Sequence, residues 1–217
     1  MWLCGCGKPL SVHYEWEGVP RDIRIESEEE SLWRYTSVLP SNNTKEKISL
    51  GEGWTPLLPI GNNVYVKDET VNPTGSFKDR GMAMAVTLAK AQNVEKICLP
   101  SAGNAGVSAS AYCQAAGIDC FVFLPETIPE PFKNETERYK AELVLSGQTI
   151  SEAAQAMINQ KEEDWFDIST LKEPFRVEGK KTLGYEIAEQ LSWSLPDVII
   201  YPTGGGTGLI GMWKAFK

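Results

Sequence analysis

Short apolar runs alternate with longer amphipathic segments from Gly51 to the end of the chain. Runs rich in β-branched and aromatic residues predict strands at 64–67, 96–99, 120–124, 142–145 and 198–201. Helical periodicity or a high alanine content predicts helices at 79–92, 105–116, 131–140, 150–161 and 181–191. Strands that alternate with helices of this length predict right-handed βαβ units, parallel sheets and hence an α/β fold.

Composition and charge narrow the class of protein. The 217 residues are 42% hydrophobic and 23% charged, as in ordinary globular chains, and no apolar run approaches the roughly 20 residues of a membrane span. The net charge of -8 argues against nucleic acid and anionic membranes as partners. The N-terminus has neither the basic nor the apolar region of a secretory signal, so we expect a cytoplasmic protein.

The rare residues exclude further chemistry. His13 is the single histidine and has no serine elbow near it, which excludes a hydrolase triad. Five cysteines fall into two sets: Cys4 and Cys6 near the N-terminus, and three in or beside apolar segments that we expect to be core residues, Cys98, Cys113 and Cys120.

Three short motifs lie at predicted strand-to-helix junctions, where open α/β sheets bind ligands. The first, residues 72–81, reads Asn-Pro-Thr-Gly-Ser-Phe-Lys-Asp-Arg-Gly and places Lys78 at the start of a helix. Because the helix dipole disfavours a cation there, the pKa of this ammonium is expected to be lowered and the free amine to be an accessible nucleophile. An ordinary surface lysine is the alternative reading of this motif alone.

The second motif, residues 100–106, is Pro-Ser-Ala-Gly-Asn-Ala-Gly, whose small residues let backbone N–H groups approach an anion. Its Asn104 can bind a ring oxygen or only cap a helix. The third motif, residues 202–208, is Pro-Thr-Gly-Gly-Gly-Thr-Gly, which predicts a phosphate nest at a helix N-terminus. It matches neither the Walker A pattern nor the dinucleotide fingerprint.

A lysine amine and a phosphate nest at different strand ends fit a cofactor that carries both an aldehyde and a phosphate. Pyridoxal 5′-phosphate is that cofactor, and it forms a Schiff base with lysine.

The motifs occur in an order that resembles the fold-type II pyridoxal-phosphate enzymes, and most closely the threonine synthase family. The resemblance covers residues 51–217 and includes Ser-Phe-Lys-Asp-Arg-Gly at 76–81 and Glu-Gly-Lys-Lys-Thr at 178–182. It implies two three-layer α/β/α domains with mostly parallel sheets, the second of them incomplete. The larger, cofactor-binding domain would comprise 51–93 and 160–217, and the smaller 94–159.

The resemblance also implies roles for individual residues. Lys78 would bond the cofactor and act as acid and base at Cα and Cβ of the substrate, and Asn104 would hold the cofactor's phenolic oxygen. Ser101 would receive the substrate carboxylate, and Arg176 the phosphate of O-phosphohomoserine. The cofactor phosphate would lie on the loop made of Gly204, Gly205, Gly206, Thr207 and Gly208.

The implied activity is a lyase reaction of threonine biosynthesis: O-phospho-L-homoserine and water give threonine and phosphate, in a homodimer when the protein is full length. Two alternatives stay open. Ala105 and Gly208 replace polar residues of many family members, which brings the site nearer to serine/threonine dehydratases or another lyase or synthase of this fold type. The chain also ends at Lys217, soon after the third motif, so we expect a fragment that could be non-catalytic alone.

Residues 1–50 differ from the rest in composition. Cys4-Gly5-Cys6-Gly7 resembles one of the two knuckles of the zinc ribbon that some relatives carry. Because structural zinc requires four ligands, we predict no metal site, with Cys4 and Cys6 as weak candidates.

Overall fold

The computed structural model describes residues 3–15, 24–41, 44 and 46–217. Within them the strands are β1 (Leu57–Gly61), β2 (Val64–Lys67), β3 (Lys96–Pro100), β4 (Asp119–Leu124), β5 (Glu142–Leu145) and β6 (Trp165–Asp167). The α-helices are α1 (Lys78–Ala91), α2 (Asn104–Ala116), α3 (Glu130–Arg138), α4 (Ile150–Gln160), α5 (Phe175–Gln190) and α6 (Thr207–Ala215). Two 3₁₀ segments are η1 (Leu32–Val38) and η2 (Glu69–Val71).

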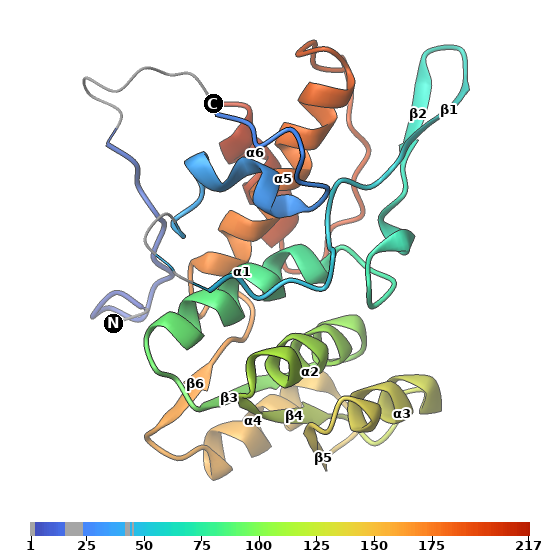
Figure 1. The fold of residues 1–217 in the computed structure, drawn as a ribbon. Coiled ribbons are helices and arrows are strands. Elements are labelled where there is room, and N and C mark those ends of the chain that lie inside the picture. Colours follow the sequence, from blue (N-terminus) through green and yellow to red (C-terminus); the bar gives the residue numbers. More distant parts are fainter. Residues whose placement is uncertain (1–2, 16–23, 42–43, 45) are drawn as a thin grey trace.

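A four-stranded parallel sheet of order β5-β4-β3-β6 forms the lower part of the molecule in Figure 1. Alternate residues of β3 enter different cores, because successive side chains of a strand point to opposite faces. Ile97 and Leu99 join the core shared with α1 and α2, and Cys98 joins the core beneath α4. The expected α/β class with a parallel, helix-covered sheet is therefore confirmed.

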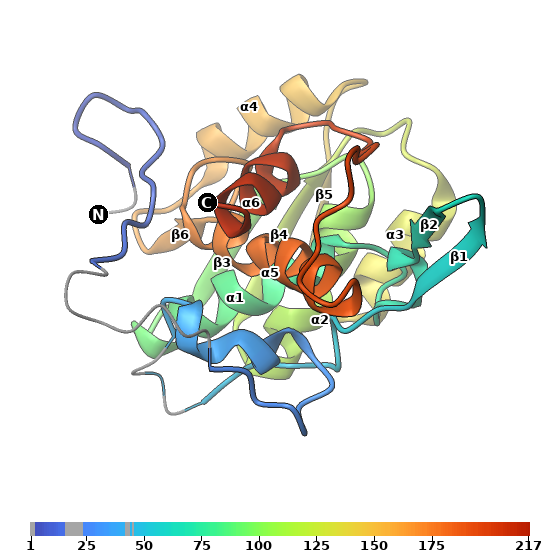
Figure 2. The same cartoon turned by 90° about the horizontal axis from the view of Figure 1, so that it is seen from above.

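Helix α1 connects this layer with the rest of the molecule. It packs against α2 on one side and against α5 on the other, and α5 in turn packs against α6 (Figures 1 and 2). The helix is almost wholly buried, and its small residues permit the close approach of both neighbours. The first residue of α1 is Lys78, so the packing of this helix fixes where that lysine lies.

Three expectations about secondary structure were wrong. Residues 198–201 form no strand, and Ile200 is 94% exposed, because no described residues pair with this run. Helix α5 begins at Phe175 rather than at 181, since Glu173 accepts hydrogen bonds from the N–H groups of Phe175 and Arg176 and so starts the helix earlier. Strand β2 pairs antiparallel with β1 in a hairpin, outside any βαβ unit.

That hairpin turns at Asn62 and Asn63, whose φ angles are 50° and 58°. Two consecutive residues with positive φ are characteristic of the type I′ turn, which asparagine tolerates. The hairpin projects from the molecule, and its exposed strand faces make no second sheet layer (Figure 1).

Two residues of the N-terminal part of the chain, Tyr14 and Arg34, contact α5 through polar bonds. Tyr14 donates a hydrogen bond to Glu178 at 2.5 Å, and Arg34 of η1 forms an ion pair with Glu189 at 2.5 Å. The division into 1–50, 94–159 and a two-part larger domain stays a prediction. No helix in the described ranges has the combination of length and apolar character that crossing a bilayer requires.

Candidate active site

The turn before α1 is held by a buried carboxylate. Asp79 accepts hydrogen bonds from the backbone N–H of Thr74 at 2.7 Å, from the Thr74 hydroxyl at 2.5 Å and from the Ser108 hydroxyl at 2.5 Å. Gly75 has a φ of 74°, which a glycine adopts without strain. These contacts fix the backbone on both sides of Lys78, so its side chain leaves a rigid turn.

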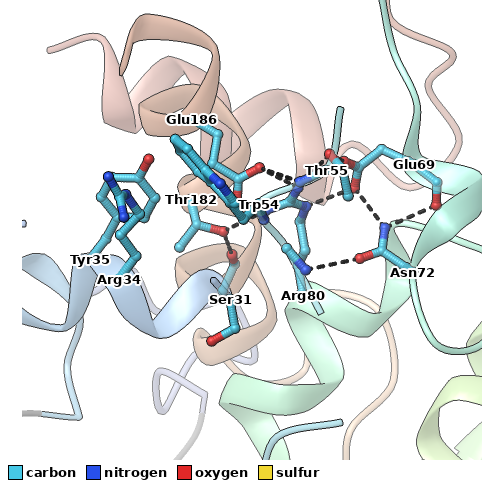
Figure 3. Close-up of polar contacts among 12 residues, drawn as sticks. Ser31, Arg34, Tyr35, Trp54, Thr55, Glu69, Asn72, Arg80, Thr182 and Glu186 are labelled. Carbon is cyan, nitrogen blue, oxygen red and sulfur yellow. Dashed lines mark hydrogen bonds and ion pairs between the residues drawn. The ribbon is translucent and has the colours of Figure 1, made fainter. Parts of the chain in front are cut away.

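A buried ion network then fastens α1 to α5. Arg80 contacts Glu69 at 2.7 Å and Glu186 of α5 at 2.5 Å, and Figure 3 shows these side chains converging with Thr55 and Asn72. Burial alone would raise the pKa of Glu186, but the charge and hydrogen bonds of Arg80, followed by those of a lysine of β2, lower it to about 2. The network therefore orders the loop leading to Lys78.

A cavity of about 120 Å³ opens at the start of α1. Side chains from three regions line it: Phe77 and Lys78 at the start of α1, Arg176 and Lys180 on one face of α5, and the segment from Tyr201 to Gly208 before α6. Thr170 completes the lining. The cavity thus brings together the lysine of the first motif, the glycine loop of the third, and the arginine expected to bind phosphate.

Lys78 has the properties of a nucleophilic amine. Burial, and after it the positive charge of Arg176, lowers the pKa of Lys78 to about 8. Its Nζ lies 3.7 Å from the ring centroid of Phe77. Because the amine is then partly neutral near physiological pH, it can attack an aldehyde.

The glycine loop forms the start of α6. Gly206 is its N-cap with a φ of 79°, and no side chain accepts the free N–H groups of the first turn. A Cβ at residue 208 would collide with the hydroxyl of Tyr201. The backbone can therefore lie this close to the tyrosine ring only because residue 208 is a glycine. Uncapped N–H groups at a helix N-terminus are a binding site for a phosphate.

Two buried polar atoms on this cavity have no hydrogen-bond partner among the described residues: Nε of Arg176 and the hydroxyl oxygen of Tyr201. Such atoms carry a desolvation cost unless a ligand satisfies them. Arg176 is itself held in place, because its Nη1 donates to the carbonyl of Ile168 at 2.8 Å. A free amine, an uncapped helix start and unpaired donors fit an anionic cofactor that carries an aldehyde.

The second motif does not contribute to this cavity. The hydroxyl of Ser101 donates to the carbonyl of Gly103 at 3.0 Å and accepts from the N–H of Gly106 at 2.9 Å, which closes the turn before α2. Asn104 is the exposed first residue of α2 and makes no side-chain cap bond, since Gly103 is the N-cap. The expected roles of Ser101 and Asn104 stay predictions.

Sequence reasoning assigned no role to two other groups on the cavity, Lys180 and Tyr201. Lys180 lies in a segment that the family resemblance had already singled out, four residues after Arg176. The signal that could have identified it is this spacing, because residues four apart lie on the same face of a helix.

The N-terminal cysteines lie elsewhere. Cys4 and Cys6 are exposed in a turn closed by a bond from the Gly7 N–H to the Cys4 carbonyl at 2.8 Å. Within the described part of the chain, no group of three or more histidine, cysteine, aspartate or glutamate side chains is arranged to hold a metal ion.

A family model for pyridoxal-phosphate dependent enzymes matches residues 48–217, and the chain belongs to this family. It is similar to the threonine synthase of Methanocaldococcus jannaschii, with 35% identity over the whole chain and 56% of the relative, and to that of a Bacillus species, with 38% identity over 85% of the chain and 54% of the relative. The chain therefore spans about half the length of the curated relatives that it matches.

The fold is also shared with solved structures. A hydrogen sulfide-producing enzyme from Fusobacterium nucleatum superposes with a TM-score of 0.68 at 22% identity, over 75% of this chain and 59% of that one. The structural likeness agrees with the expected fold, and the family match confirms the expected family and its cofactor, pyridoxal phosphate.

Proposed function

We propose that the chain is part of a threonine synthase, a lyase that converts O-phospho-L-homoserine and water into L-threonine and phosphate. The observation that carries this proposal is the placement of the Lys78 amine opposite the uncapped glycine loop across one small cavity. The similarity to two threonine synthases over most or all of the chain supports the choice of substrate.

The chain's own groups divide the work. The N–H groups at the start of α6 hold the cofactor phosphate, and Arg176 holds the substrate phosphate. The bound cofactor supplies an electron sink that stabilises negative charge at Cα. Lys78 would take the proton from Cα of the substrate, because its lowered pKa leaves part of the amine neutral near physiological pH. After releasing that proton, the amine would remove a second proton, from Cβ, as the γ-phosphate leaves. Protons returned to Cγ and Cα, with a hydroxyl from water at Cβ and the other proton of that water on the released phosphate, would give threonine.

The first test is covalent labelling. The chain is mixed with pyridoxal phosphate, reduced with borohydride and digested, and the modified peptide is located by mass spectrometry. We expect a single adduct on Lys78, and none in Lys78→Ala. Labelling spread evenly over the exposed lysines would show that no site forms and would leave the chain as a non-catalytic fragment.

The second test concerns the substrate. Phosphate release from O-phospho-L-homoserine supports a threonine synthase. Formation of a keto acid from serine or threonine, without phosphate release, supports the second candidate, a dehydratase. That candidate is favoured by Gly208, which lines the cavity without a polar side chain to recognise a phosphorylated substrate.

We further propose that the whole protein is a cytoplasmic homodimer. Light scattering after gel filtration would give about twice the mass of one chain. A monomeric mass at micromolar concentration would contradict this proposal.

A further inference from the structure

Lys180 is a buried lysine that forms no ion pair with any of the described residues. Its side chain is 2% exposed, and its Nζ donates one hydrogen bond, to the neutral hydroxyl of Thr207 at 2.6 Å. No carboxylate in the described ranges lies within ion-pair distance of it. The ring centroid of Phe77 lies 5.0 Å away and offers only a weak attraction.

The neighbouring lysine, Lys181, is equally buried but forms an ion pair. It lies on the same helix, and its Nζ contacts the Glu178 carboxylate at 2.8 Å and the Val38 carbonyl at 2.8 Å. Burial of both ammonium groups is therefore costly, and only that of Lys181 is offset by an ion pair within the described chain.

The surroundings of Lys180 increase this cost. Burial lowers its pKa well below the usual range, and the charges of Arg176 and Lys78 lower it further. Glu173 is the nearby carboxylate that opposes this effect, but burial raises the pKa of Glu173 itself to about 7, so it carries only part of a charge at neutral pH.

Thr207, which holds the Lys180 ammonium, is the first residue of α6. A cation at a helix N-terminus opposes the helix dipole, and the N–H groups of this turn have no side-chain cap. Arg176, one turn earlier on α5, presents an unpaired Nε to the same cavity. Two buried basic groups and an uncapped helix start favour the binding of a multiply charged anion.

We propose that Lys180 supplies a positive charge that binds a phosphate monoester dianion in the cavity between Arg176 and the start of α6. This inference rests on the proposed function for the identity of the ligand. The phosphate can come from the cofactor or from a phosphorylated substrate, which share this chemistry. Lys180 is thus a binding residue of the cavity in addition to Lys78 and the glycine loop.

The test exploits the missing ion pair. Lys180→Met keeps the length of the side chain and removes the ammonium, so the ligand-free chain should unfold at the same or a higher temperature than the wild type. Its affinity for inorganic phosphate, measured by calorimetry at constant ionic strength, should fall by about 10- to 100-fold, the worth of a charge-assisted hydrogen bond. Lys180→Arg should recover most of that affinity.

Lys181→Met is the matched control. It removes an equally buried ammonium from the same helix, but it leaves Glu178 without that partner, so the ligand-free chain should unfold at a lower temperature while phosphate affinity is retained. If Lys180→Met behaves in the same way, with lower stability and unchanged phosphate affinity, Lys180 only supports the fold and the proposal is overturned.

Two further titrations identify the source of the phosphate. A loss of affinity for pyridoxal phosphate but not for pyridoxal assigns Lys180 to the cofactor phosphate. A loss for O-phosphohomoserine but not for homoserine, in protein loaded with the cofactor, assigns it to the substrate phosphate. Binding of inorganic phosphate requires neither turnover nor cofactor, so a chain that shows the Lys180 effect but forms no specific adduct on Lys78 would contradict the proposed function and leave this inference standing.

Discussion

The amine of Lys78 is accessible to an electrophile only when it is neutral, and its surroundings control how often this occurs. Burial is the larger influence and the charge of Arg176 the second, and together they lower the pKa of Lys78 to about 8. A lysine in water holds its proton until about pH 10.4. The hydrogen bonds of Asp79 hold the turn from which the Lys78 side chain extends along the cavity.

We therefore expect the rate of adduct formation with pyridoxal phosphate to rise with pH and to level off above about pH 8. Arg176→Gln removes the nearby positive charge but not the burial of Lys78. The midpoint of the rate against pH should therefore move upward without reaching that of a free amine. The rate is followed by absorbance across pH 6–11, with N-acetyl-lysine methyl ester as the reference. A midpoint in the wild type equal to that of the reference would contradict a buried, perturbed amine.

At the scale of elements, the site depends on how closely α1 and α5 approach each other. A Cβ at Gly179 would collide with the Arg80 carbonyl, and one at Gly81 would lie 3.1 Å from the Arg176 carbonyl. The two glycines let the backbones meet, and this contact places Lys78 on the same cavity as Arg176.

Gly179→Ala should therefore destabilise the chain by about 1–3 kcal/mol, the usual cost of an overpacked contact. Urea unfolding measures it, with Gly5→Ala as the control because a Cβ there meets nothing within 4 Å. An unchanged midpoint for Gly179→Ala would show that the helices can separate at no cost.

The ion network between the same helices makes stability depend on pH. The pKa of Glu186 is lowered from 4.5 to about 2, so its contribution is complete above pH 4.5 and is lost as the pH falls toward 2. Glu186→Gln leaves the buried Arg80 with Glu69 as its remaining ion-pair partner and should lower the free energy of unfolding by about 3–5 kcal/mol at pH 7.

Urea midpoints between pH 2 and pH 7 test this expectation. The variant should lose less stability than the wild type on acidification, and the exposed Glu163→Gln should follow the wild type. Parallel pH curves for the wild type and Glu186→Gln would contradict the network's role.

Much of this arrangement can be predicted from sequence, and the predictions that were wrong have physical causes. The glycine loop stands out because four glycines in five residues have few structural explanations, and Lys78 stands out only in combination with that loop. Lys180 does not, because a lysine in a helix is usually solvated, and its burial depends on the packing of α5. The start of α5 was misplaced for the same reason: its first turns bury charged residues, among them Arg176, Glu178 and Lys180, and hydrophobic periodicity does not record this.

At the scale of the whole molecule, the described surface is unevenly apolar. Besides the β1–β2 hairpin, one stretch of the sequence near the C-terminal end contains many of the exposed large apolar side chains: Trp193, Leu195, Val198, Ile199, Ile200, Leu209, Ile210 and Trp213. Sequence alone predicted a strand at residues 198–201 because they have the composition of a buried strand. The prediction failed because they pair with no described segment. Apolar surface of this extent favours association.

We expect the purified chain to self-associate with increasing concentration, and the double substitution Val198→Ser with Ile200→Ser to reduce this. These side chains are 75% and 94% exposed, so the free energy of unfolding measured in urea should stay within about 0.5 kcal/mol of the wild-type value, as is usual for surface substitutions. Ile158→Ser on α4 is the control, since it removes an exposed apolar side chain, 63% exposed, that lies outside this C-terminal segment. Sedimentation velocity at several concentrations distinguishes the outcomes: equal association of the double variant and the wild type would mean that contacts elsewhere hold the copies together.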